Sequence, residues 1–82
     1  MDFGKIGRFL RQLRREKGIT QEELSTIINI DRSAISKWER GIYPPSTEML
    51  NTLAKLYNIT VNEIILAEKK NDKNEEDLSD LP

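Results

Sequence analysis

Apolar side chains recur along residues 1–67 at the three- and four-residue spacing of an α-helix. The first stripe consists of Ile6, Phe9, Leu10 and Leu13. It ends near Gly18, and glycine commonly follows the last turn of a helix because it tolerates a left-handed backbone. Runs in which apolar and polar residues alternate, as in a half-buried strand, are scarce. The pattern therefore predicts a chain of helices.

Residues that favour helix N-termini divide the remaining apolar positions into four further helices. The predicted N-caps are Thr20, Asp31, Ser46 and Thr60. Thr20 and Thr60 are each followed three residues later by a glutamate, which is the spacing of a capping box. Asn29 lies between the second and third helices, where a tight turn favours a residue that tolerates a left-handed backbone. The sequence therefore predicts a compact, all-α, five-helix domain whose last four helices cover residues 20–28, 31–40, 46–58 and 60–66.

The same stripes predict the buried face of each helix. The inward residues are Leu24, Ile27 and Ile28 in the second helix and Ala34, Ile35 and Trp38 in the third. In the fourth helix they are Met49, Leu50, Leu53, Leu56 and Tyr57. With its apolar side inside, the third helix leaves an outer face of hydroxyl and basic side chains, Arg32, Ser33, Ser36 and Lys37.

Net charge changes along the chain. The 82 residues contain 13 Lys and Arg and 14 Asp and Glu, a net charge of −1 that by itself disfavours a polyanionic partner. The first helix nevertheless carries six basic residues and one glutamate over residues 5–17. Residues 68–82 contain six acids, three lysines and two apolar side chains, too few to form a packed core. We therefore predict an ordered domain over residues 1–67 with a basic surface, and a disordered acidic tail over residues 68–82.

Cysteine and histidine are both absent from the chain. Their absence excludes disulfides, thiolate and imidazole metal sites, and the nucleophile and acid–base systems that need them. We expect no enzyme activity, no catalytic residues, no metal and no organic cofactor. The longest apolar run, residues 64–66, is far shorter than the roughly 20 residues of a membrane span. We therefore expect no membrane partner and a cytoplasmic location.

The helices predicted over residues 20–28 and 31–40 are short and are joined by about three turn residues. This is the spacing of a helix-turn-helix, in which the second helix can enter the major groove of DNA. Hydroxyl and basic side chains on the outer face of that helix suit base edges and phosphates. The sequence therefore favours double-stranded DNA as a partner.

Two motifs carry a family resemblance, Thr20-Gln21-Glu22-Glu23-Leu24 and Ser36-Lys37-Trp38-Glu39-Arg40-Gly41. In this order and at this spacing they resemble the Cro/C1-type helix-turn-helix family of bacterial and phage regulators, also called the xenobiotic-response-element family. The resemblance extends over about residues 6–66. It implies a lambda-repressor-like fold and a dimeric transcriptional repressor that binds a short, palindromic operator.

The resemblance also implies roles for individual positions. The base-reading positions are Arg32, Ser33, Ser36 and Lys37, and the phosphate-contacting positions are Gln21, Arg11 and Tyr43. Arg14 and Glu39 match a structural ion pair that ties the first helix to the recognition helix. Two residues depart from the family pattern, since Asn29 replaces a frequent glycine and Ile27 replaces a frequent charged residue.

Apolar residues of the last helix form the predicted dimer seam, Val61, Ile64, Ile65 and Leu66. A symmetric homodimer would read two half-sites about one helical turn apart. The acidic tail has three interpretations: a solubilising segment, a competitor for the basic surface, or a segment that folds on a protein partner. The last keeps a second function open, the antitoxin of a toxin–antitoxin pair, which binds a protein toxin and autoregulates its operon. A purely protein-binding helical module is a third alternative, and a restriction–modification controller is a variant of the DNA-binding function.

Overall fold

The computed structural model describes residues 1–69, and residues 70–82 lie outside the described part. The predicted acidic tail, with the protein partner assigned to it, therefore falls almost entirely outside the described residues. Within them the chain forms five helices, α1 (Phe3–Glu16), α2 (Gln21–Ile28), α3 (Arg32–Glu39), α4 (Thr47–Tyr57) and α5 (Val61–Leu66). The predicted all-α, five-helix fold is confirmed.

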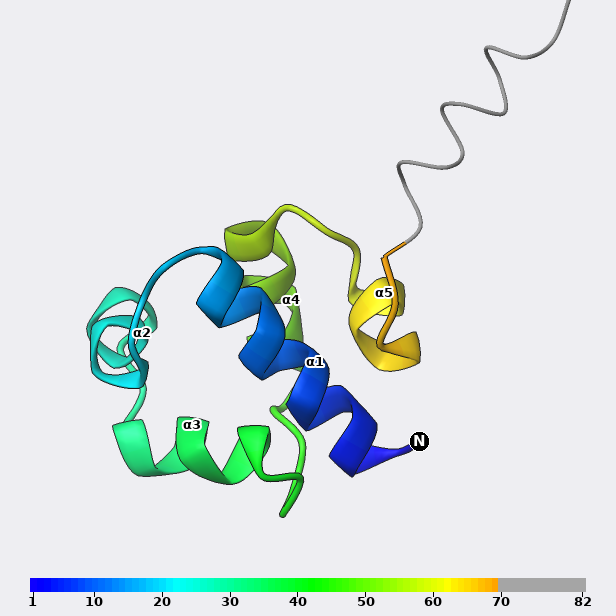
Figure 1. Ribbon diagram of the computed structural model, residues 1–82, viewed down its shortest axis with the longest axis horizontal. Coiled ribbons are helices and arrows are strands. Elements are labelled where there is room, and N and C mark those ends of the chain that lie inside the picture. Colours follow the sequence, from blue (N-terminus) through cyan, green and yellow to red (C-terminus); the bar gives the residue numbers. More distant parts are fainter. Residues whose placement is uncertain (70–82) are drawn as a thin grey trace, which may run out of the picture.

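Helix α1 organises the domain. It packs against both α3 and α5, while α2 packs against α3 and α4 packs against α5. In Figure 1, α1 crosses the middle of the view, with α2 and α3 on one side and α5 on the other. The helix-turn-helix segment is therefore held to the rest of the domain largely through α1.

The helix ends form as their capping residues predict. The four predicted N-caps are Thr20, Asp31, Ser46 and Thr60. The side chain of each accepts a backbone N–H of the following turn. Both capping boxes are complete, because the glutamate three residues later accepts the backbone N–H of the capping threonine. Asn29 adopts the expected left-handed conformation, with a φ of 56°. One cap was not predicted: Asp2 accepts the backbone N–H of Lys5 and so begins α1.

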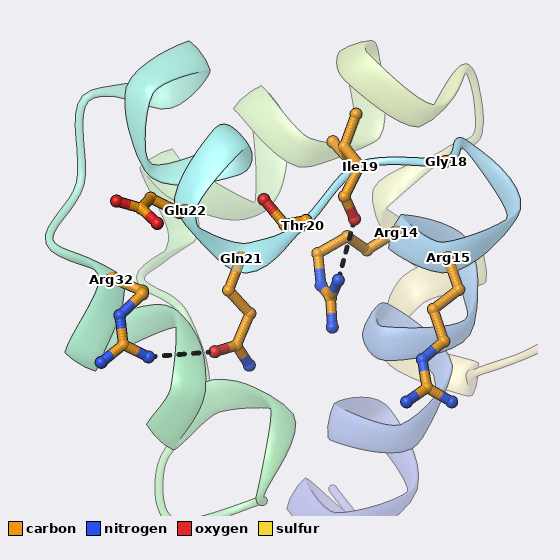
Figure 2. A pocket seen from close by; sticks show the side chains of 8 residues that line it. All are labelled: Arg14, Arg15, Gly18, Ile19, Thr20, Gln21, Glu22 and Arg32. Carbon is orange, nitrogen blue, oxygen red and sulfur yellow. Dashed lines mark hydrogen bonds between the residues drawn. The ribbon is translucent and has the colours of Figure 1, made fainter.

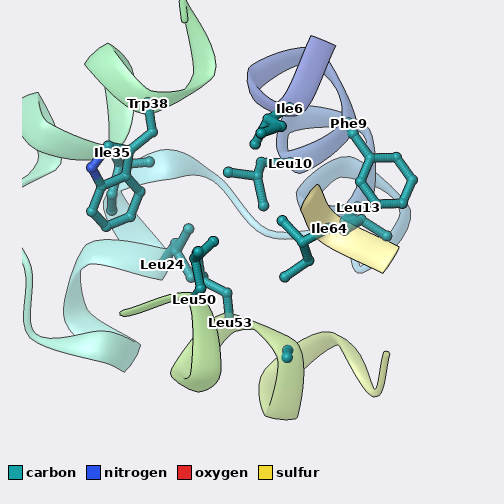
Figure 3. Packing of buried hydrophobic residues seen from close by; sticks show 11 residues of the cluster. Ile6, Phe9, Leu10, Leu13, Leu24, Ile35, Trp38, Leu50, Leu53 and Ile64 are labelled. Atoms are coloured by element: carbon teal, nitrogen blue, oxygen red, sulfur yellow. The ribbon is translucent and has the colours of Figure 1, made fainter. Parts of the chain in front are cut away.

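Side chains from all five helices meet in one hydrophobic core, shown in Figure 3. Its buried members are Ile6, Phe9, Leu10, Leu13, Leu24, Ile35, Trp38, Leu50, Leu53, Ala54 and Ile64. Ile35, Leu53 and Ile64 are the largest side chains that are fully enclosed. Trp38 is buried, which agrees with its predicted core position on α3.

The prediction that Ile27 belongs to the core is wrong. Its side chain is 53% exposed, whereas Leu24 is buried and Ile28 is partly buried against the core. Leu24 and Ile28 lie one helical turn apart on the covered side of α2, while Ile27 projects about 100° away from Ile28. The covered stripe of this short helix is too narrow to include all three.

Glycine allows the backbones of α1 and α3 to touch. A Cβ atom at Gly7 would lie 2.4 Å from the carbonyl oxygen of Trp38 and 2.7 Å from that of Glu39. A Cβ atom at Gly41, whose φ is +77°, would lie 2.8 Å from the Cα atom of Gly4. These contacts fix the distance between α1 and the C-terminal end of α3.

Gly7→Ala is therefore expected to lower the free energy of unfolding by about 1–3 kcal/mol, because the new methyl group forces the two helices apart. Urea unfolding followed by circular dichroism measures this loss. Gly4→Ala is the matched control, since its Cβ atom would meet nothing closer than 3.5 Å. The control should be neutral or slightly stabilising, because alanine favours a helix more than glycine does. Equal effects of the two substitutions would contradict the close contact.

Candidate nucleic-acid interface

The turn between α2 and α3 is held by local hydrogen bonds. The backbone N–H groups of Asn29 and Ile30 both donate to the carbonyl oxygen of Ser25. The Ser25 hydroxyl in turn donates to the carbonyl oxygen of Ile30 at 2.6 Å. Asp31 then begins α3 by accepting the backbone N–H of Ser33 at 3.1 Å and the Ser33 hydroxyl. The angle between the two helices is thus set within the turn itself.

Hydrogen bonds to Ser33 lower the pKa of Asp31, with the side-chain hydroxyl as the largest cause and the backbone N–H as the second. The carboxylate therefore stays ionised at neutral pH. A negative charge at this end of α3 also interacts favourably with the helix dipole.

The predicted base-reading residues do share the outer face of α3, but they are not equally accessible. Arg32 and Ser33 are exposed, whereas Ser36 and Lys37 are half-buried. The Ser36 hydroxyl accepts a hydrogen bond from Nε of Arg40 at 3.2 Å. Arg32 and Lys37 are therefore the long, basic side chains that this face presents.

A buried ion pair connects α1 to α3, at the positions that the family motif indicated. Nε of Arg14 lies 2.7 Å from Oε2 of Glu39, and a second guanidinium nitrogen lies 3.0 Å from Oε1. The guanidinium also donates to the carbonyl oxygen of Ile19 at 2.8 Å, ahead of α2. The hydrogen bonds that Arg14 donates to Glu39 raise the pKa of Arg14 above its usual value, and this bidentate geometry is the strongest form of the pair.

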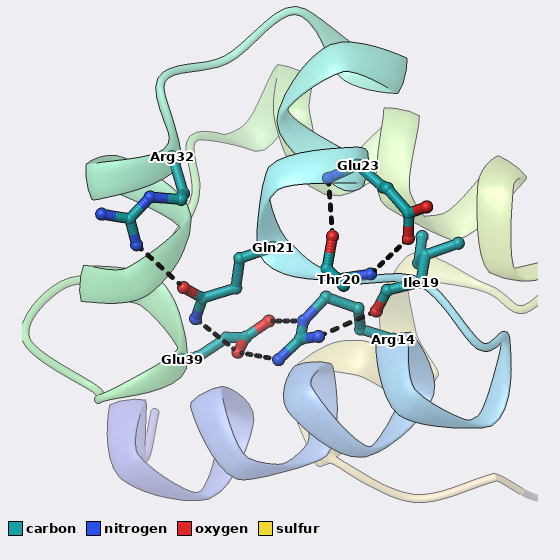
Figure 4. A network of polar contacts seen from close by, with 7 residues as sticks. All are labelled: Arg14, Ile19, Thr20, Gln21, Glu23, Arg32 and Glu39. Atoms are coloured by element: carbon teal, nitrogen blue, oxygen red, sulfur yellow. Dashed lines mark hydrogen bonds and ion pairs between the residues drawn. The ribbon is translucent and has the colours of Figure 1, made fainter.

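Gln21 extends this network to α2 and to Arg32 at the start of α3 (Figure 4). Its amide Nε2 donates to Oε1 of Glu39 at 3.0 Å, and its amide oxygen accepts from Arg32 at 3.4 Å. Residues from α1, α2 and α3 are thereby linked in one chain of polar contacts. The family resemblance predicts Gln21 as a phosphate contact but does not indicate this bridging position, because the contact joins residues 18 positions apart.

An open groove lies beside this network, between the C-terminal end of α1 and the N-terminal end of α2. It is lined by Arg14, Arg15, Gly18, Ile19, Thr20, Gln21, Glu22 and Arg32. Figure 2 shows Arg15, Gln21 and Arg32 projecting toward the same side of the molecule. Backbone N–H groups at a helix N-terminus and several guanidinium groups together form a surface that suits an anion such as phosphate. The sequence indicates Arg15 only as one of the six basic residues of the first helix.

The two other predicted phosphate contacts lie outside this groove. Arg11 is exposed on α1, where it lines a separate hollow with Arg8 and Arg15. Tyr43 is 42% exposed in the segment that follows α3. The structure therefore places the predicted DNA-contacting residues on three neighbouring parts of the surface rather than in one pocket.

The predicted dimer seam needs a correction at Ile64. This side chain is fully buried, because α5 turns it toward the core between α1 and α4, and it has no surface to offer a partner. Val61 and Ile65 are half-buried, and Leu66 is 44% exposed. A seam on α5 could therefore involve only these three apolar residues.

Residues 1–69 contain no cluster of three or more acidic residues placed to hold a metal ion. None of the five described helices has the length and apolar character that crossing a membrane requires.

A family profile described as helix-turn-helix matches residues 10–64. The chain belongs to the Cro/C1-type helix-turn-helix family of transcriptional regulators. This helix-turn-helix regulator is 40% identical over 60 residues to the transcriptional activator BcrR of Enterococcus faecalis, covering 73% of this chain and 29% of BcrR. It is 33% identical over 73 residues to the transcriptional regulator ImmR of Bacillus subtilis, covering 89% of this chain and 58% of ImmR.

Among solved structures, the helix-turn-helix regulator resembles the restriction-modification controller protein C.AhdI of Aeromonas hydrophila. The TM-score is 0.69 and the identity 36%, over 77% of this chain and 96% of the controller. The chain thus spans less than two thirds of the two curated relatives and almost the whole controller. The matched residues 10–64 include the Arg14–Glu39 pair and all of α2, α3 and α4.

Proposed function

We propose that this helix-turn-helix regulator binds double-stranded DNA sequence-specifically and represses transcription by occupying a palindromic operator. The observation that carries the proposal is the Arg14–Glu39–Gln21–Arg32 network, which fixes α3 with its basic outer face exposed. A helix that is rigidly held in this way can enter the major groove without further ordering. The neighbouring arginine-lined groove supplies positive charge for the DNA backbone.

Individual roles follow from accessibility and chemistry. Arg32 can pair with the two acceptors of guanine, and Lys37 can donate to base edges or phosphates. The Ser33 hydroxyl donates to Asp31 and so can accept from a base, whereas the Ser36 hydroxyl accepts from Arg40 and so can donate to one. For contacts to phosphate we propose Gln21, Arg11 and Tyr43. Gln21 retains one amide proton beyond its bond to Glu39, and that proton can reach a phosphate at the start of α2.

Binding as a symmetric dimer is part of the proposal. A single recognition helix reads only a few base pairs, whereas a genome offers very many competing sites. Two copies that bind half-sites one helical turn apart double the sequence that is read. We assign this contact to the exposed side of α5, where Leu66 is the most exposed apolar residue and Val61 and Ile65 are half-buried.

Selection of bound duplexes from random DNA tests the function directly. We expect enrichment of one short sequence that repeats in inverted order at about one helical turn. Placing the selected site across a promoter should then allow the protein to reduce transcription in vitro. Failure to enrich any sequence, although the folded protein is present, would contradict sequence-specific binding. Enrichment of a single, unrepeated half-site would contradict the dimer, and increased transcription would contradict repression.

Arg32→Ala is expected to weaken binding to the selected operator by about 1–3 kcal/mol, because a guanine loses its bidentate partner. The preference for one base at one position of each half-site should be relaxed at the same time. Competition binding against operators altered at single positions measures both effects. Lys55→Ala, on the exposed side of α4, removes the same charge and should leave the preference unchanged. If Arg32→Ala weakens binding to all duplexes equally, Arg32 contacts phosphate and not a base.

A further inference from the structure

Three arginines lie along the exposed side of α1, Arg8, Arg11 and Arg15. We call them the arginine row. Their spacing of three and four residues places them on one side of the helix. They line a single hollow together with Gln12 and Glu16. Over seven residues the row extends for about 10 Å, since a helix rises 1.5 Å per residue.

None of these three guanidinium groups makes a hydrogen bond or an ion pair with another residue in the described range 1–69. The acid that lines the same hollow, Glu16, already has partners. Its carboxylate accepts from Gln12 at 2.9 Å and from Lys69 at 2.9 Å. These two contacts lower its pKa, with the Gln12 hydrogen bond as the largest cause. Within residues 1–69, no acidic side chain therefore pairs with the arginine row.

The arginine row lies on the helix that packs against α3. Arg8 follows Gly7, whose backbone touches α3, and Arg15 follows Arg14, which pairs with Glu39 of α3. Arg15 also lines the groove at the start of α2, so the two hollows share this residue. Arginines therefore line both hollows, from Arg32 at the groove to Arg8 on α1, together with the acids Glu22 and Glu16.

Three guanidinium groups along about 10 Å of helix suit a phosphate backbone. Successive phosphates of one strand are further apart than the roughly 3.4 Å that separates them along the helix axis, because the strand winds around that axis. The row can therefore contact about two of them, and arginine pairs with phosphate in a bidentate way.

We infer that the arginine row is a second backbone-binding surface, which follows one DNA strand away from the bases that α3 reads. This inference rests on the proposed DNA-binding function and extends it to Arg8 and Arg15. The surface recognises phosphates and not bases, so it strengthens binding to every duplex alike. It also lengthens the DNA that each protomer covers on the side of α1.

The test measures the salt dependence of binding by the full-length protein to a labelled duplex of arbitrary sequence. Each phosphate contact contributes about 0.9 to the slope of log affinity against log salt concentration. Arg8→Gln and Arg15→Gln should each reduce this slope by about 1, and the double variant by about 2. Lys55→Gln on α4 removes the same charge away from the arginine row and should leave the slope unchanged. Circular dichroism confirms that each variant remains folded.

The outcomes separate this inference from the proposed function. Absence of binding by the unaltered protein, even at low salt, would overturn the proposed function. Normal binding with an unchanged slope in both arginine variants would overturn the inference alone. Tighter binding by the variants would also overturn it, since the row would then hold acidic residues of the chain itself in competition with DNA.

Discussion

Glu39→Ala is expected to lower the free energy of unfolding by about 3–5 kcal/mol, because it leaves the guanidinium of Arg14 buried without its anionic partner. Both side chains of the pair are largely enclosed, at 10% and 4% exposure. The same substitution removes the acceptor of the Gln21 amide, so one of the two hydrogen bonds that join Gln21 to α3 is lost as well. Since a domain of this size is marginally stable, a large fraction of the molecules should be unfolded at 37 °C.

Chemical denaturation of a small series of variants measures the effect of the pair. Glu39→Gln keeps the shape of the side chain and one acceptor, so its loss should be smaller than that of Glu39→Ala. The double variant Arg14→Met with Glu39→Leu removes both charges and should recover most of the stability, because buried ion pairs are replaceable by apolar side chains. The double variant should still bind the operator poorly, since Gln21 and Arg32 lose their support. A loss below about 1 kcal/mol for Glu39→Ala would place the pair among solvent-screened surface contacts.

Ile64→Ala is expected to destabilise the domain by about 2–5 kcal/mol, because it opens a cavity at a side chain with no exposed surface. The loss should be the same at every protein concentration, since Ile64 belongs to the core of a single chain. Thermal and urea unfolding at several protein concentrations measure it.

Leu66→Ala is the control for the same helix. Leu66 is 44% exposed, so its truncation should have little effect on the folding of a monomer. It should instead weaken the proposed dimer, which sedimentation on operator DNA detects. If the loss of stability in Ile64→Ala depended on protein concentration, Ile64 would belong to the dimer seam after all.

The local features of the fold were predictable because they depend on neighbours in the sequence. A threonine and a glutamate three residues apart specify a capping box whatever surrounds them, and both predicted boxes form. Asn29 likewise supplies the left-handed turn before α3. The outer face of α3 followed from the apolar periodicity that commits Ile35 and Trp38 to the core. Helix positions and the helix-turn-helix spacing are thus encoded locally.

The errors in the predicted core and seam have a different origin. Ile27 and Ile64 both follow the apolar spacing of their helices, yet one is exposed and the other is fully buried. Periodicity indicates that a helix has a covered side, but the width of that side depends on how many neighbouring helices pack against it. A short helix such as α2 or α5 has too few residues for the pattern to determine this.

The order of residues along the chain was sufficient to specify five helices, their ends and the chemistry presented by α3, because these depend on contacts within about four residues. Only the tertiary structure decided which contacts hold α3 and its side chains in position. Gln21 joins Glu39 to Arg32, Gly7 brings α1 against the backbone of α3, and Arg15 connects the groove to the arginine row. Each of these relations joins elements that lie next to each other only after the chain has folded, so no periodicity in the sequence contains them.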